Sequence, residues 1–311
     1  MGLFSLIAVL LLEQMRPLSY RQVVYGPLSS LAHFLEGRFN AGGRDHGLIA
    51  WVLGVGGLVV MAGGVYWALL AINPVLAWAW NVALLYVTMG FRQFSHSYTA
   101  IQFALRMDDL AEARRLLAEW RGRSADGLSS SEIARLAIEE ALAASHRHVF
   151  GVLVCFVLLP GPCGAVLYRA AAFFAEAWGN RIDADIGAFG RFARQAFAVI
   201  DWLPARLTAF GFAIVGDFED AIHCWRTQAD KWADSPLGGG IGVVLASGAG
   251  ALGVRLGMPV VEAGEIADRA TIGVGDEADA DFMQSAVGLV WRALLLWLLL
   301  LLLLGLATLI G

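Results

Sequence analysis

The most prominent pattern in the chain is a series of long apolar blocks separated by segments rich in charge. A helix needs about 20 apolar residues to cross the hydrocarbon core of a bilayer. The blocks lack the alternation of a barrel strand, and a lipid-embedded backbone must satisfy its own amides, so the pattern predicts spanning helices. The predicted spans lie near Gly47–Ile72, Val75–Phe91, Val149–Leu167, Ala196–Val215 and Ala286–Ile310.

The polar segments predict how these spans are threaded. Asn73-Pro74 separates the first two spans and is short enough only for a tight hairpin. The loops on either side of that hairpin therefore share one face of the membrane, and they carry more than half of the chain's arginines. Arginine-rich loops are retained in the cytoplasm, which places residues 92–148 and then 216–285 there. Leu3–Leu12 is apolar but short, and whether it spans is left open.

The cytoplasmic loops are predicted to be partly folded. Leu105–Arg121 has apolar residues at helical spacing and predicts an amphipathic helix. Ser129 and Glu132 have the spacing of a capping box, so a second helix is predicted over Glu132–Ala144.

Composition supports this assignment and narrows the partners. Hydrophobic residues make up 58% of the chain and charged residues 16%, whereas a soluble domain has about 25% charged residues. We therefore predict an all-α, polytopic helical membrane protein forming a single membrane domain, with the lipid bilayer as its partner. The net charge of −5 argues against a nucleic-acid partner, which would favour a basic patch. The three cysteines show no metal-binding or disulfide pattern, and we interpret them as small buried hydrophobes.

Known nucleotide and metal motifs are weak or absent. Gly248–Gly253 fits G-x-G-x-x-G after the strand-like Ile241–Leu245, but a dinucleotide site requires further strands that this chain does not supply. Close packing of a segment rich in glycine and alanine is the favoured interpretation. The only lysine, Lys231, is followed by Trp232, so no P-loop is present. His146-Arg147-His148 has no carboxylate or cysteine at ligand spacing, and no metal site is predicted.

Ionisable residues in or beside the apolar segments are better functional candidates, because such residues are costly in hydrocarbon. Asp201 and Arg206 share one predicted span, with Pro204 between them. They form either an internal ion pair or a polar site at the membrane surface. Glu132, Arg135 and Glu139 lie at three- and four-residue spacing on one face of a predicted helix, which is either a solvated, salt-bridged face or part of a site.

Several short motifs occur in the order typical of the CobD/CbiB family, which the chain resembles from about Ala111 to Gly257. They are Glu132-Ile133-Ala134-Arg135, Ile138-Glu139, Gly161-Pro162-Cys163-Gly164-Ala165, Tyr168-Arg169-Ala170, Pro204-Ala205-Arg206-Leu207, Ser235-Pro236 and Ala249–Gly257. The resemblance implies an integral membrane enzyme of cobalamin biosynthesis in the bacterial inner membrane. Such an enzyme, an adenosylcobinamide-phosphate synthase, joins a propionate carboxyl of adenosylcobyric acid to aminopropanol phosphate as an amide, at the expense of ATP.

On this resemblance we predict a cytoplasmic site for an anionic ligand. Arginine suits bidentate recognition of carboxylate and phosphate, and the candidate ligand-binding residues are Arg135, Arg169, Arg206 and Arg226. The candidate catalytic residues, as a base or a Mg²⁺ ligand, are Glu139 and Asp201. The resemblance also implies ATP and Mg²⁺ as cofactors and a corrinoid as substrate.

A second function stays open, because some polar motifs of the enzyme group are replaced here. Leu237 stands where the family has an asparagine after Ser-Pro, and Arg16-Pro17 lies where an early acidic stretch is expected. Val149–Arg169 and Ile200–Leu207 are also similar to AmpE, an inner-membrane protein linked to β-lactamase regulation. The alternative is therefore a non-catalytic sensor or signalling protein. The sequence predicts no oligomeric state.

Overall fold

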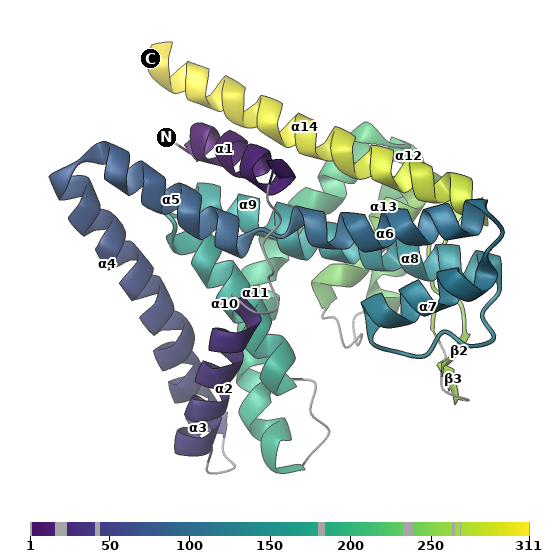
Figure 1. Cartoon of the computed structure of the whole chain (residues 1–311), viewed down its shortest axis with the longest axis horizontal. Coiled ribbons are helices and arrows are strands. Elements are labelled where there is room, and N and C mark those ends of the chain that lie inside the picture. Colours follow the sequence, from purple (N-terminus) through teal and green to yellow (C-terminus); the bar gives the residue numbers. More distant parts are fainter. Residues whose placement is uncertain are drawn as a thin grey trace. The chain divides into compact units, whose positions relative to one another are not determined.

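The computed structural model describes residues 2–15, 24–40, 44–179, 184–232, 239–262, 265–267 and 269–310 (Figure 1). Within it the chain forms two compact units. The first contains Met1–Gly90 and Arg147–Pro204, and the second contains Phe91–His146 and Ala205–Gly311. The predicted motif Ser235-Pro236 and the residues Arg16, Pro17 and Leu237 lie outside the described residues.

The first unit is built from helices throughout its described part. They are α1 (Gly2–Met15), α2 (Gly26–Phe39), α3 (Arg44–Trp51), the π-helical η2 (Val52–Gly56), α4 (Gly57–Ile72), α5 (Pro74–Thr88), α9 (Gly151–Leu158), α10 (Cys163–Gly179) and the first part of α11 (Ala184–Val215). A π-helical turn, η3 (His146–Phe150), leads into α9. α10 packs against α2, α4, α5 and α9, and α1 packs against α5.

The hairpin predicted at Asn73-Pro74 is present, and its residues explain the turn (Figure 1). Asn73 leaves the helical conformation at the end of α4, and its side-chain oxygen accepts a hydrogen bond of 2.8 Å from the Val75 amide. Pro74 occupies the first helical position, where its missing N–H costs nothing. The Trp80 indole N–H donates to the Ala62 carbonyl at 3.1 Å, which ties the two helices together.

The predicted span Val149–Leu167 does not coincide with one helix. α9 ends at Leu158, and α10 begins at Cys163 after a turn that contains Pro160 and Pro162. Gly161, between these prolines, has φ of +61°, which a residue with a side chain rarely adopts. Proline and a left-handed glycine therefore end the helix in the middle of an apolar block.

The second unit contains helices and short strands. They are α6 (Phe91–Arg106), α7 (Leu110–Arg121), α8 (Ser130–Ser145), the second part of α11, α12 (Phe218–Gln228), the 3₁₀ helix η4 (Ala229–Trp232), α13 (Gly239–Leu252), β1 (Val254–Arg255), β2 (Val260–Glu262), β3 (Glu265–Ala267), β4 (Asp276–Glu277) and α14 (Ala280–Ile310). α8 packs against α6, α7, α13 and α14.

The two predicted loop helices exist, with altered bounds. The helix predicted over Leu105–Arg121 is interrupted, because Asp108 has φ of +58° and Asp109 caps α7 by accepting a 3.0 Å hydrogen bond from the Glu112 amide. The predicted capping box of α8 is confirmed. The Ser129 side chain accepts from the Glu132 amide, and the Glu132 carboxylate accepts from the Ser129 amide at 2.8 Å.

The segment that reads as a strand before Gly248 is instead part of α13. This helix packs against α12 and η4 so closely that a Cβ atom at Gly250 would overlap the Asp220 carbonyl. A Cβ at Gly248 would lie 2.9 Å from a methyl group of Leu142 on α8. The glycine motif therefore serves helix packing, as favoured from the sequence, and the strand-like interpretation of Ile241–Leu245 is wrong.

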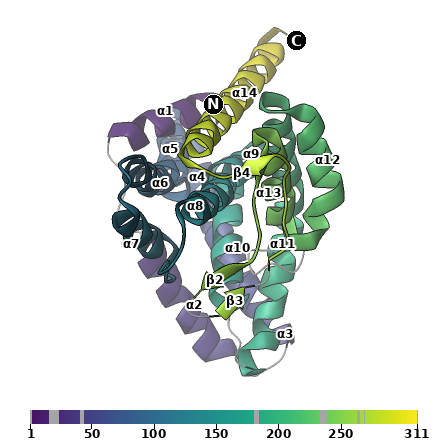
Figure 2. The ribbon, with the colours of Figure 1, turned by 90° about the vertical axis from the view of Figure 1, so that its right-hand side faces the viewer.

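The short strands form an extended excursion between α13 and α14 (Figure 2). β1 pairs with β4 in parallel, and β2 pairs with β3 antiparallel. An isolated bridge joins Leu256 to Ile272 between these two pairs. The chain therefore runs out from the end of α13, turns at β2–β3, and returns to the start of α14.

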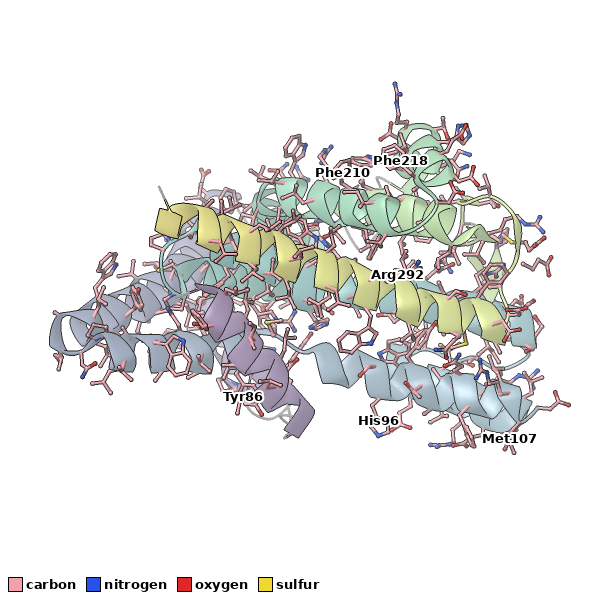
Figure 3. The ribbon with its side chains drawn as sticks, turned by 90° about the horizontal axis from the view of Figure 1, so that it is seen from above. Tyr86, His96, Met107, Phe210, Phe218 and Arg292 are labelled. Carbon is pink, nitrogen blue, oxygen red and sulfur yellow. The ribbon has the colours of Figure 1, made fainter. Side chains whose placement is uncertain are left out.

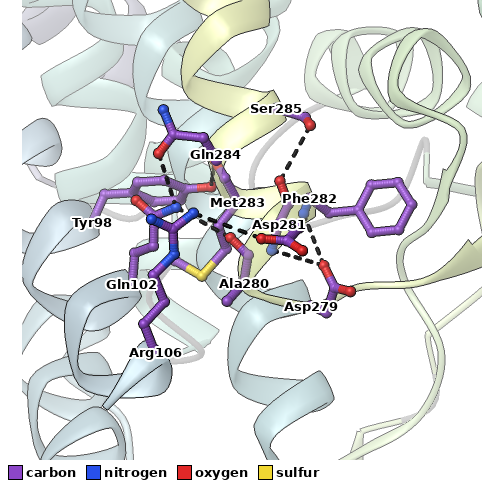
Figure 4. A network of polar contacts seen from close by, with 10 residues as sticks. All are labelled: Tyr98, Gln102, Arg106, Asp279, Ala280, Asp281, Phe282, Met283, Gln284 and Ser285. Atoms are coloured by element: carbon purple, nitrogen blue, oxygen red, sulfur yellow. Dashed lines mark hydrogen bonds and ion pairs between the residues drawn. The ribbon is translucent and has the colours of Figure 1, made fainter. Parts of the chain in front are cut away.

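The first turn of α14 is fixed to α6 by polar side chains (Figure 4). The Tyr98 hydroxyl donates to the Met283 carbonyl at 2.8 Å, and the Gln102 side-chain amide donates to the Ala280 carbonyl at 3.1 Å. Asp279 caps the helix by accepting from the Asp281 amide at 2.8 Å.

Four helices in the described part of the chain are long and apolar enough to cross a membrane. They are Asp45–Ile72, Ser130–Leu158, Phe189–Val215 and Ala280–Ala307. α5 and residues 2–13 form shorter apolar helices. Figure 3 shows α14, with Arg292 labelled along its length. The predicted fold class, an all-α polytopic membrane protein, is confirmed, whereas the sides on which the loops lie stay predictions.

Candidate functional site

α8 brings two of the predicted site residues together. Arg135 and Glu139 are four residues apart, so they lie on the same face of the helix, one turn from each other. Each residue is only 6% exposed. The interpretation of this face as solvated and salt-bridged is therefore wrong, since charged groups that are this deeply buried need partners within the protein.

Glu139 receives these partners from the excursion between α13 and α14. Its Oε1 atom accepts a hydrogen bond of 2.8 Å from the Gly257 amide, and its Oε2 atom forms an ion pair with Arg269. Both carboxylate oxygens are thus engaged by residues more than 100 positions away in the sequence. Glu139 therefore holds both the outgoing and the returning part of the excursion against α8.

The backbone near Gly257 and Arg269 explains why they reach Glu139. Gly257 has φ of +78°, and a Cβ atom there would overlap the Ala270 carbonyl, so only glycine fits. The Trp232 indole N–H donates to the same Ala270 carbonyl at 2.8 Å. The Arg269 guanidinium lies over the Trp232 ring, 4.8 Å from its centroid, in a cation–π contact.

Gln228 fixes the returning segment of the excursion, between β3 and β4. Its side-chain oxygen accepts from the Gly273 amide at 2.6 Å, and its side-chain nitrogen donates to the Gly273 carbonyl at 3.5 Å. This pair of contacts ties residue 273 to the end of α12. Contacts with α12, η4 and α8 therefore position the segment that carries Arg269.

The arginines of the cluster keep unused hydrogen-bond donors. The Nε and Nη2 atoms of Arg135 are buried without a hydrogen-bond partner among the described residues, and so is the Nη1 atom of Arg269. The charges of Glu139 and Arg269 both act on the Arg135 guanidinium, as do those of Glu132 and Glu277. With one buried carboxylate for two guanidinium groups, the cluster of Arg135, Glu139 and Arg269 carries one net positive charge.

The other predicted site residues lie elsewhere. Asp201 and Arg169 belong to the first unit and are 5% and 8% exposed. The Tyr168 hydroxyl donates to an Asp201 carboxylate oxygen at 2.8 Å, so this buried carboxylate has a polar neighbour on α10. Arg206 belongs to the second unit, and the pairing of Asp201 with Arg206 stays a prediction.

Arg226 lies on the exposed face of α12. It lines a surface hollow together with residues of the same helix, namely Glu219, Ile222, His223 and Thr227. No described contact joins Arg226 to Glu139, and its assignment as a ligand-binding residue stays a prediction.

Sequence reasoning missed Arg269, Gly257 and Trp232 as parts of the cluster. Gly257 ends the Ala249–Gly257 motif, and that motif is the one signal that points to this segment. Arg269 and Trp232 have no such signal, because their roles depend on contacts made over long sequence separations.

The Mg²⁺ implied by the family resemblance has a limited fit to this cluster. Mg²⁺ prefers oxygen ligands such as carboxylates, and both oxygens of Glu139 are engaged by protein donors. No group of three or more His, Cys, Asp or Glu residues that could hold a metal occurs among the residues the structure describes. Glu139 as placed here is therefore not a metal ligand.

Comparison with known proteins gives a consistent result. The family model described as CobD/Cbib protein matches residues 19–290. The chain is 36% identical over 302 residues to the "Cobalamin biosynthesis protein CobD" of Stutzerimonas stutzeri, covering 96% of both chains. It is 36% identical over 231 residues to the protein of the same name from Chromobacterium violaceum, covering 74% of this chain and 72% of that one.

A more distant relative carries the other family name. The "Cobalamin biosynthesis protein CbiB" of Salmonella typhimurium is 28% identical over 262 residues, covering 80% of this chain and 78% of its own length. No solved structure matches the chain.

Proposed function

Because the chain belongs to the CobD/CbiB family, we propose that it acts in cobalamin biosynthesis as an adenosylcobinamide-phosphate synthase. The reaction forms an amide between a propionate carboxyl of adenosylcobyric acid and the amine of aminopropanol phosphate. The C–N bond forms as one C–O bond of the carboxyl breaks. The departing oxygen leaves in the phosphate product of ATP, and the amine releases protons to solvent. The observation that carries this proposal is the 36% identity that extends over 96% of a CobD protein.

The cluster on α8 supports an anionic ligand of this kind. Both organic substrates and ATP carry carboxylate or phosphate groups. Arg135 and Arg269 have buried N–H groups that donate no hydrogen bond to any described residue. Guanidinium groups bind such anions through paired, charge-assisted hydrogen bonds. In this proposal Glu139 is a positioning residue, because it orients Arg269 and holds the Gly257 backbone. Asp201 stays the candidate catalytic base.

Genetic complementation tests the proposal. A strain that lacks its own CobD or CbiB is supplied with adenosylcobyric acid under conditions in which growth requires cobalamin. We expect expression of this chain to restore growth, and membranes from these cells to accumulate adenosylcobinamide phosphate detectable by mass spectrometry. An empty vector and immunoblots of the membrane fraction control for background and expression.

The opposite result identifies the alternative. If well-expressed protein restores no growth and the purified protein binds no adenosylcobyric acid, the ligase proposal is wrong. A non-catalytic AmpE-like role would then account better for the chain.

A further inference from the structure

Three guanidinium nitrogen atoms in the described part of the second unit are buried, and their N–H groups have no acceptor. They are the Nε and Nη2 atoms of Arg135 and the Nη1 atom of Arg269. Arg135 is 6% exposed, and the Arg269 side chain is 19% exposed. Folded proteins leave few buried polar groups unsatisfied, since an unmade hydrogen bond at a buried donor is costly, and more so at a charged one. These donors therefore point to a partner that is not part of the described chain.

The nearby carboxylates leave the donors free. Glu139 is engaged by Gly257 and Arg269. Glu132 is committed to the capping box, where its Oε2 atom accepts from the Ser129 amide at 2.8 Å and from the Ser129 hydroxyl at 2.7 Å. Glu277 acts on Arg135 through its charge, but it lies on β4 with its side chain exposed. Among these carboxylates, Glu139 is the buried one whose charge acts on Arg135, and Arg135 shares that charge with Arg269.

We propose that Arg135 and Arg269 together bind a phosphate group of a substrate, an inference that rests on the proposed function. A phosphate monoester has three terminal oxygens and a charge near −2 at neutral pH. Its three oxygens can accept from the three unpaired nitrogen atoms, and the negative charge offsets the excess positive charge of the cluster. Glu139 pairs with the Nη2 atom of Arg269, and the Trp232 ring lies against the guanidinium, whereas the buried Nη1 atom has no acceptor among the described residues.

Two substrates of the proposed reaction contain a terminal phosphate with three such oxygens: aminopropanol phosphate carries it as a monoester, and ATP carries it as an anhydride. The chemistry that the cluster recognises is the same in both, so the test includes each as a separate ligand. Aminopropanol without its phosphate and inorganic phosphate complete the set. These four probes separate recognition of the phosphate from recognition of the rest of the molecule.

The experiment is calorimetric titration of the full-length protein in detergent with each probe. Arg135→Gln removes the free donors while leaving the Glu139–Arg269 pair in place. Arg269→Lys keeps the charge that Glu139 needs but removes the free Nη1 donor. Arg255→Gln is the matched control, because Arg255 lies exposed on β1 of the same excursion.

Both site variants should weaken binding of a phosphorylated probe by about tenfold or more, the effect of losing hydrogen bonds between charged groups. Binding of aminopropanol should not change, and Arg255→Gln should bind as the wild type does. A response confined to aminopropanol phosphate or to ATP supports the site and identifies the source of the phosphate.

Thermal stability provides the second readout. An arginine that serves ligand binding has unpaired hydrogen-bond donors when no ligand is bound. In the absence of ligand, Arg135→Gln should therefore melt at the same temperature as the wild type or at a higher one. A structural arginine would lower the melting temperature on removal. A fall as large as that of Glu139→Gln would overturn the proposal, and a matching fall in Glu277→Gln would identify Glu277 as the structural partner.

The binding data overturn the proposal if the wild type binds neither phosphorylated probe, or if both site variants bind them as tightly as the wild type. These results are distinguishable from failure of the proposed function. If the wild type restores growth and the variants bind phosphate as it does, the enzyme assignment stands and the proposed phosphate site is wrong. If phosphate binding depends on Arg135 but the chain does not restore growth, the phosphate site stands and the proposed ligase function is wrong.

Discussion

Two long apolar helices of this protein have opposite environments. In Ser130–Leu158, 78% of the most apolar window is buried within the protein, whereas in Ala280–Ala307 the share is 22%. Both are long and apolar enough to span a bilayer. The buried helix carries Arg135 and Glu139, which other residues of the second unit surround. The exposed helix carries one charged residue beyond its first turn, Arg292, whose Nε atom donates to its own helix at the Gly288 carbonyl.

The difference teaches what hydropathy can and cannot report. An apolar block identifies a helix that avoids water, but it does not say whether lipid or protein surrounds it. Ionisable residues make that distinction, because a charge is tolerated in an apolar helix when protein groups or a cavity face it. Leu299, Leu303 and Leu304 on α14 are more than half exposed, as expected for a helix that faces lipid.

The largest expected effect follows from breaking the charge pair of the buried helix. Glu139→Gln leaves the Arg269 guanidinium without its counterion, and breaking a buried pair typically costs about 3–5 kcal/mol of unfolding free energy. We expect a large fall in the thermal midpoint of the protein in detergent, measured by intrinsic fluorescence, together with reduced yield.

Glu119→Gln is the control for this prediction. Glu119 pairs with Arg115 on α7, but its side chain is 71% exposed, so its loss should change the midpoint little. Equal midpoints for Glu139→Gln and the wild type would show that the pair does not stabilise the second unit.

Glycines sharpen the same contrast between protein-facing and lipid-facing helices. In Gly250→Ala on α13, the added Cβ meets the backbone of Asp220 and Ala221, and overpacking of this kind costs about 1–3 kcal/mol. In Gly288→Ala on α14, no atom lies within 4 Å of the new Cβ, so the better helix propensity of alanine should stabilise by about 0.5–1 kcal/mol. Thermal midpoints of the two variants should therefore move in opposite directions, and a shift of both in one direction would contradict the assignment.

The contact between α6 and the start of α14 should have a smaller effect. Tyr98 is buried, and burial raises the pKa of its hydroxyl, so the group stays protonated and donates to the Met283 carbonyl. Tyr98→Phe removes that bond and should cost about 1 kcal/mol. The neighbouring Thr99→Ala, whose exposed hydroxyl bonds its own helix at Ser95, is the control and should melt as the wild type does. Equal midpoints for all three proteins would show that the bond does not contribute.

Most of the helical fold was predictable, because long apolar blocks and helix caps are local signals. The hairpin at Asn73 and the capping box at Ser129 depend on residues within a few positions of each other, and both predictions are confirmed. The predicted span Val149–Leu167 failed to match a helix, since the apolar composition of the block conceals the helix end at Leu158 and the left-handed turn at Gly161.

The candidate site was predictable only in part. Arg135 and Glu139 are neighbours on one helix, so their spacing indicates that they lie together. Arg269 is 130 residues from Glu139, and no local pattern predicts that contact. The strand-like composition of Ile241–Leu245 was misleading for a related reason, because packing of α13 against α12 and η4 determines its conformation.

The smallest effect is expected on α7, where charges face solvent. Arg115 pairs with Glu112 at 2.6 Å and with Glu119 at 3.2 Å, but all three side chains are at least 41% exposed. The hydrogen bond from Arg115 holds the pKa of Glu112 below its ordinary value. A lowered pKa in the folded state means that the pair contributes at neutral pH and loses its contribution as the pH falls through the pKa of Glu112. Any difference in thermal midpoint between Arg115→Gln and the wild type should therefore be small at pH 7 and shrink further on acidification, as scanned from pH 7 to pH 4. A fall as large as that of Glu139→Gln would mean that the exposed pairs of α7 stabilise this protein as strongly as the buried pair of α8. A difference that grows in acid would contradict the lowered pKa of Glu112.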